Sequence, residues 1–195
     1  MPGPVSRREE GVMSDRYADL PPERRQQALG WAWSHAYMWA TNVQRLADRL
    51  LDTTNATMVE RIGDGAALTL AVRNVLRAAE MAHDLADGDK AEKMAAAIDD
   101  FKRALPDVVK ARNVLEHFDE YTVGQGWMQQ KQSKADQAVE PYRMWCSADQ
   151  GSYVFELGPL RVDALTAREA AARLAAAVGL VEPPPWKSDE SGASS

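Results

Sequence analysis

Apolar residues recur at helical spacing through most of the chain, and the breaks between these runs divide it into predicted helices. The first helix is expected from Pro21 to about Leu51, because proline fits the first helical turn and Glu23 suits the positive end of the helix dipole. A helix apolar over more than one stripe is typical of a core or a subunit interface, and the core is the weightier interpretation here. The apolar residues in question are Trp31, Trp33, Tyr37, Met38, Trp39, Val43, Leu46 and Leu50.

A second helix is predicted over about 66–85, where apolar residues again follow helical spacing. The Gly63-Asp64-Gly65 sequence before it is interpreted as a break in the chain, with Asp64 as the N-cap. Gly88 is expected to end this helix.

Two shorter helices follow in this interpretation. Asp89 with Glu92 resembles a capping box for a helix that ends near Leu105. Pro106 breaks the pattern and starts a fourth helix, which Gly124 ends.

After a polar loop that begins at residue 124, the apolar residues no longer follow helical spacing. Aromatic and β-branched residues near 142–157, interrupted by Asp149-Gln150-Gly151, predict a β-hairpin that must pack on the helices. Thr166 with Glu169 makes another capping box, so a last helix is expected near 164–178, closed by Gly179.

The predicted fold class is therefore mainly α: a four-helix bundle with an appended β-hairpin and a C-terminal helix. Residues 19–182 form the predicted domain, whereas residues 1–18 and 183–195 are polar and are expected to be disordered tails. Sequence alone leaves open whether Met1 or Met13 is the native start.

Composition narrows the function classes. The chain has 195 residues with 45% hydrophobic residues and a net charge of −6, so it can bury a core, and the molecule as a whole does not attract nucleic acid or anionic membrane. Cys146 is the only cysteine, which excludes an intrachain disulfide. The first residues do not resemble a signal peptide and no stretch is long enough to cross a bilayer, so a cytoplasmic location without a membrane partner is expected.

The fourth predicted helix carries the best functional lead, the pair Arg112 and His117, which flank its polar face. An imidazole can take a proton from a hydroxyl near neutral pH, and a guanidinium fits a phosphate with two parallel hydrogen bonds. Together they could activate a ribose 2′-OH and hold the adjacent phosphate without a metal. From spacing alone, the weightier interpretation is that Arg112 pairs with Glu116 on a solvated face.

This segment resembles the signature of the HEPN superfamily, whose small helical bundles carry an arginine, a following polar residue and a histidine a few residues on. Arg112, Asn113 and His117 match that pattern, and the resemblance covers roughly residues 21–124. It implies a helical homodimer with two motifs facing across the interface, which in active members forms a metal-independent endoribonuclease. Arg112 would then hold the phosphate, His117 would be the acid/base, and Asn113 would either orient the site or contact substrate.

Other residues are weaker candidates. Lys110 would offset the nearby acids toward a substrate, and Trp127 would either stack a base or plug the end of the bundle. Glu80-x-x-His83 has the spacing of di-metal bundles, but no second copy occurs, so Glu80 and Asp84 are interpreted as surface acids and neither metal nor cofactor is expected. His35 is expected in the core or an interface. Cys146 has no histidine beside it and is not expected to be a nucleophile.

Two hypotheses of nearly equal weight follow. The first is a HEPN-like homodimer of toxin or defence type that cleaves RNA through Arg112 and His117. The second is a catalytically inactive HEPN-like module that dimerises or binds a nucleotide or a protein partner. In a dimeric structure, an open basic cleft lined by both motifs would favour the enzyme. Glu116 on the guanidinium together with a filled cleft would favour the module.

Overall fold

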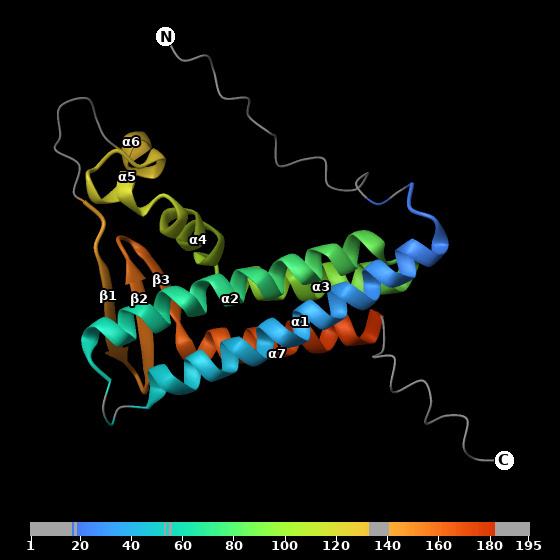
Figure 1. The fold of residues 1–195 in the computed structure, drawn as a ribbon, viewed down its shortest axis with the longest axis horizontal. Helices are drawn as coiled ribbons and strands as arrows, with labels where there is room; N and C mark the ends of the chain where they lie inside the picture. Colours follow the sequence, from blue (N-terminus) through green and yellow to red (C-terminus); the bar gives the residue numbers. More distant parts are fainter. Residues whose placement is uncertain (1–16, 18, 53, 55, 133–140, 182–195) are drawn as a thin grey trace, which may run out of the picture.

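The computed structural model describes residues 17, 19–52, 54, 56–132 and 141–181, and there the chain is mainly helical with one small antiparallel sheet (Figure 1). This confirms the predicted mainly helical class. The long helices are α1 (Pro22–Leu51), α2 (Met58–Leu85), α3 (Gly88–Ala104) and α7 (Ala164–Val181). Apart from Tyr17, the predicted tails at 1–18 and 183–195 lie outside the described residues.

The four long helices run side by side in Figure 1, and the fourth of them comes from the end of the chain. Helix α1 packs against α2 and α7, and α3 packs against the same two helices. The segment 106–124, expected as the fourth helix, instead holds the short helices α4 (Val108–Glu116) and α5 (Phe118–Thr122). Alanines on the buried face of α7 explain its central place, because small side chains let helices approach closely.

Helix α2 begins eight residues earlier than predicted, because its start is fixed by a capping box at Thr57 and Glu60. The hydroxyl of Thr57 accepts from the Glu60 amide at 3.3 Å, and the Glu60 carboxylate accepts from the Thr57 amide at 2.7 Å. The predicted break at Gly63-Asp64-Gly65 is therefore wrong. Asp64 is not an N-cap but pairs with Arg49 of α1 at 3.1 Å.

Gly65 serves packing rather than chain reversal. A Cβ placed on it would lie 2.5 Å from Cδ2 of Phe155, so only glycine lets the phenyl ring rest on the α2 backbone. Phe155 is buried in β2, and this contact helps to seat the sheet against α2.

The predicted hairpin is confirmed, and a third strand extends it. Strands β1 (Met144–Asp149) and β2 (Ser152–Leu157) pair antiparallel around Gln150 and Gly151, whose φ angles of 46° and 85° fit a tight hairpin turn. Strand β3 (Leu160–Asp163) pairs with β2 on its other side, giving the order β1-β2-β3. The sheet lies at one end of the long helices (Figure 1).

The last helix starts at Ala164 as predicted, but its cap and its end differ from the prediction. The Asp163 carboxylate accepts a hydrogen bond from the Thr166 amide at 2.7 Å, so Asp163 caps α7 and the Thr166–Glu169 box does not. The helix continues through Gly179 to Val181, where the Lys90 ammonium donates to the terminal carbonyl at 2.8 Å. Helix α3 likewise starts at Gly88, ahead of the predicted Asp89 cap.

Candidate functional site

The guanidinium of Arg112 is already paired in this structure. It forms an ion pair with Glu116 one turn further along α4, and it donates a hydrogen bond to the Asn113 side chain at 3.1 Å. An arginine held in this way is less free to hold a phosphate, because an incoming anion must displace a carboxylate. This is the surface pairing that spacing alone favoured.

His117 lies where the predicted helix breaks. Its φ and ψ of −120° and 33° end α4 and precede α5, so the polar face expected to run continuously from Arg112 past His117 is interrupted. Its side chain is 61% exposed, with Nδ1 3.7 Å from a carboxylate oxygen of Glu120. Arg112 and His117 therefore each face a different glutamate.

The other two substrate-binding candidates, Lys110 and Trp127, lie on different helices. Lys110 is exposed on α4. Trp127 begins α6 (Trp127–Gln132), a helix inside the predicted loop, and is 62% exposed rather than plugging the bundle. The Lys131 ammonium lies 4.0 Å from the centre of the Trp127 ring, a cation–π contact that occupies one face of the indole.

The cysteine, Cys146, is a buried structural residue. Cys146 is buried in β1, and its thiol donates to the carbonyl oxygen of Arg61 at 3.2 Å. Burial raises the pKa of the Cys146 thiol to about 11, so it is not a thiolate at neutral pH.

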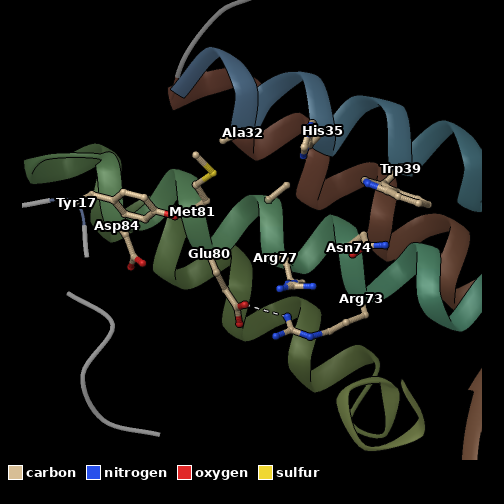
Figure 2. A pocket seen from close by; sticks show the side chains of 11 residues that line it. Tyr17, Ala32, His35, Trp39, Arg73, Asn74, Arg77, Glu80, Met81 and Asp84 are labelled. Atoms are coloured by element: carbon tan, nitrogen blue, oxygen red, sulfur yellow. Dashed lines mark hydrogen bonds and ion pairs between the residues drawn. The ribbon is translucent and has the colours of Figure 1, made fainter. Parts of the chain in front are cut away.

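A cleft of about 500 Å³ between α1 and α2 gathers the polar side chains that sequence analysis did not connect (Figure 2). One end holds Tyr17, just before α1, and Asp84, in the last turn of α2. The other holds Trp39, Arg73 and Asn74. This order follows from the antiparallel packing of the two helices, which Arg25 fixes by donating to the Leu85 carbonyl at 2.8 Å. The cleft is lined by Tyr17, Ala32, His35, Trp39, Arg73, Asn74, Arg77, Ala78, Glu80, Met81 and Asp84.

Charges inside the cleft are partly neutralised. The carboxylate of Glu80 lies 2.9 Å from the Arg73 guanidinium, the contact drawn in Figure 2, and 3.4 Å from the Lys102 ammonium of α3. The side chains of Arg73 and Glu80 are 20% and 18% exposed, so Glu80 is not the surface acid that was expected. No described residue forms an ion pair with Arg77, which is exposed at the cleft.

Asp84 is the other acid misjudged from sequence. Its side chain is only 9% exposed, and its Oδ1 atom lies 3.3 Å from Nδ1 of His83. Its Oδ2 atom is buried and receives no hydrogen bond from the described residues. Buried carboxylate oxygens without a donor are rare in folded proteins, so this oxygen is the acceptor at the cleft whose hydrogen bond the described residues do not supply.

His35 is exposed and lines the cleft, in edge-on contact with Trp31 at 6.1 Å between ring centres. Of the two places expected for it, the core is therefore wrong, and an interface stays a prediction. Of its aromatic neighbours on α1, Trp33 is buried while Trp31 is 57% exposed. A signal for the cleft did exist in the sequence. Positions 73, 77, 80 and 84 are charged at helical spacing in the second half of α2, where most other residues are apolar.

Among the described residues, no helix is long and apolar enough to span a membrane, and no group of three or more histidine, cysteine or acidic side chains is arranged to hold a metal ion. Comparison of the chain with protein-family models, with curated proteins and with solved structures found no match. The HEPN resemblance of the Arg112–His117 segment therefore stays an expectation drawn from sequence.

Proposed function

We propose that the protein is a binding module and that the cleft between α1 and α2 takes a small polar ligand. The observation that carries this proposal is Asp84, a residue that lines the cleft and whose buried Oδ2 atom lacks a donor among the described residues. An ionised carboxylate in such a place destabilises the fold unless a donor reaches it. A ligand with an N–H or O–H group would supply that donor.

The walls of the cleft suit such a role because they are built on two long helices rather than on loops. Sites on rigid elements hold their geometry before the ligand arrives, which lowers the entropy lost on binding. Apolar groups from Ala32 and Met81 stand beside the charged ones, a mixture typical of small-molecule sites.

RNA cleavage through Arg112 and His117 is the second candidate function. The exposed imidazole of His117 is the observation in its favour, since a base must reach its substrate. Against it, Glu116 neutralises the guanidinium that would bind phosphate. Of the two hypotheses drawn from sequence, this pairing supports the inactive module rather than the endoribonuclease.

The proposal includes a homodimer, in which a second copy of the chain covers another face of α1. A groove of about 670 Å³ between α1 and α7 is lined by Trp33, Tyr37 and alanines of α7. At about 100° per residue, its α1 residues lie nearly opposite those of the ligand cleft. Sedimentation velocity at rising concentration tests this. The dimer should weaken in Tyr37→Glu, whose wild-type side chain is 62% exposed, and a monomer at every concentration contradicts it.

Thermal denaturation with a panel of amines, amino acids, sugars and nucleotides tests ligand binding. A compound that binds only the folded state raises the stability by about 2.7 kcal/mol at a hundred times its Kd. We expect at least one compound to raise the melting temperature of the wild type and not of Asp84→Asn. Asp99→Asn, at an exposed aspartate of α3, is the matched control. A panel without any binder, or one whose binders ignore Asp84→Asn, contradicts the proposal.

A further inference from the structure

Two charged side chains in the cleft between α1 and α2, Arg77 and Asp84, do not form an ion pair with another residue that lines it. Arg73 and Glu80 form an ion pair at 2.9 Å, which removes both as free charges. Arg77 has no ion-pair partner among the described residues, and Asp84 has a buried oxygen without a donor. The cleft thus offers a cationic group and an anionic group to whatever enters it.

These two groups are separated along the same helix face. Asp84 is seven residues after Arg77, two turns of α2, so their Cα atoms are about 10.5 Å apart. Figure 2 shows Asp84 at one end of the cleft and Arg77 toward its middle, with Asn74 beyond. The amide of Asn74 is one turn before Arg77 and can add a second donor for an anion.

Apolar side chains line part of the space between the two charges, beside the carboxylate of Glu80 that Arg73 and Lys102 already neutralise. Met81 and Ala78 of α2 and Ala32 of α1 form this lining, with the ring of Tyr17 at the Asp84 end. A hydrocarbon linker can pack against these apolar side chains and gain free energy from the apolar area it buries.

We infer that the ligand is an extended zwitterion, with an ammonium group at Asp84 and a carboxylate or phosphate at Arg77, joined by an apolar chain. This inference rests on the proposed function of the cleft and names its ligand class. A short zwitterion such as glycine carries its ammonium and its carboxylate on one carbon and cannot reach both groups. A diamine would place a cation against Arg77, and a dicarboxylate would place an anion against Asp84, so like charges disfavour both.

Isothermal titration of the full chain with matched probes tests the inference. The zwitterions are 6-aminohexanoate and 8-aminooctanoate, with 6-aminohexylphosphonate as the phosphate-like arm. The controls are hexylamine and hexanoate, which lack one charge each, 1,6-diaminohexane, adipate, and glycine as a short zwitterion. We expect at least one extended zwitterion to bind about tenfold or more tightly than every control, because a charged hydrogen bond is lost with each missing end. Whether the carboxylate or the phosphonate binds more tightly identifies the anionic group.

Two variants assign the ends. Asp84→Asn and Arg77→Gln should each weaken the zwitterion about tenfold or more, while Arg45→Gln, at an exposed arginine of α1 outside the cleft, should not. After Arg77→Gln, hexylamine should bind as well as the zwitterion, since the anion no longer has a partner. Equal binding of hexylamine and the zwitterions by the wild type, or no effect of Arg77→Gln, overturns the inference while leaving an Asp84-dependent site intact. Failure of every zwitterion to bind also overturns it, and the broader compound panel then decides separately whether the cleft binds any ligand.

Discussion

The guanidinium of Arg61 donates a hydrogen bond to the carbonyl oxygen of Leu50 at 2.9 Å, and a second to the Asp52 carbonyl at 3.2 Å. Leu50 lies in the last turn of α1 and Asp52 is its C-cap, so a side chain from the first turn of α2 satisfies carbonyls that a helix end leaves open. Arg61 is 7% exposed and also stacks over the Tyr153 ring at 4.4 Å. One residue therefore joins two helices and the sheet.

Arg61→Met should lower the free energy of unfolding by about 2–3 kcal/mol, because it leaves buried carbonyls without donors. Arg45→Met, at an exposed position of α1, is the control and should change stability by less than about 0.5 kcal/mol. Urea denaturation followed by circular dichroism measures both. Equal effects of the two substitutions would mean that the capping bonds contribute nothing.

Two glycines of α2 should respond in opposite ways to alanine. A Cβ on Gly63 meets nothing within 4 Å, so Gly63→Ala should stabilise the helix by about 0.5–1 kcal/mol. A Cβ on Gly65 would lie 2.5 Å from Phe155, so Gly65→Ala should destabilise the fold despite the better helix propensity. Thermal melts of the two variants give the sign directly. Stabilisation by both would show that Phe155 can move away without cost.

The N-cap of α7 makes a pH-dependent contribution. Burial alone would raise the pKa of Asp163, but hydrogen bonds from Ser152 and Thr166 and the charge of Arg161 together lower it below 3.8. Because the folded pKa lies below the unfolded one, the stabilisation is fully present above about pH 4 and is lost as the pH falls through the folded value. Asp163→Ala should cost about 1 kcal/mol at pH 7 and less in strong acid.

Glu169→Ala is the matched control for that cap, since Glu169 belongs to the capping box that α7 does not use. Its exposed side chain should contribute little at either pH. Denaturant titrations at pH 7 and in acid measure the difference. A cost of Asp163→Ala that does not change with pH would contradict the charged-cap account.

Two aspartates of α2 are almost equally buried but differ in their partners. The Asp64 side chain is 12% exposed and pairs with Arg49, whereas the Asp84 side chain is 9% exposed and has an oxygen without a donor. Without ligand, Asp84→Leu should raise the free energy of unfolding by about 1 kcal/mol or more, and Asp64→Leu should lower it. A loss of stability in Asp84→Leu would indicate that the residue serves the fold rather than a ligand.

Local signals in the sequence predicted some elements well and others poorly, for identifiable reasons. The start of α1 at Pro22 and the hairpin turn at Gln150-Gly151 follow from backbone preferences of the residues themselves. Gly65 was misinterpreted because a glycine needed for close packing looks the same in sequence as one that ends a helix. Strand β3 has four residues, too few for a periodic pattern to emerge.

The candidate site could likewise be predicted only in part from the sequence. The charged row 73, 77, 80 and 84 is visible as helical periodicity. Which of these charges are paired depends in part on Lys102 of α3, which only the tertiary structure brings near Glu80. The pairing of Arg112 with Glu116 was foreseeable because it lies within one helix turn. The break at His117 was not, since neither glycine nor proline marks it.

The ribonuclease hypothesis and the binding module make opposite predictions for RNA. We expect the pure, folded protein to leave single-stranded and structured RNA intact, because Glu116 occupies the guanidinium of Arg112 and His117 faces Glu120 rather than the arginine. Glu116→Gln should not create activity if Arg112 has no catalytic role.

One outcome would contradict this expectation and support the HEPN-like mechanism. It is cleavage by the wild type that survives EDTA, leaves 2′,3′-cyclic phosphate ends and falls about 10²–10⁴-fold in His117→Ala, because an acid–base group usually contributes a factor of that size. Cleavage that persists in His117→Ala would instead point to a contaminating nuclease or to another site on the chain. His117 is exposed, so His117→Ala should leave the melting temperature nearly unchanged, and lost activity could then be assigned to chemistry rather than to unfolding.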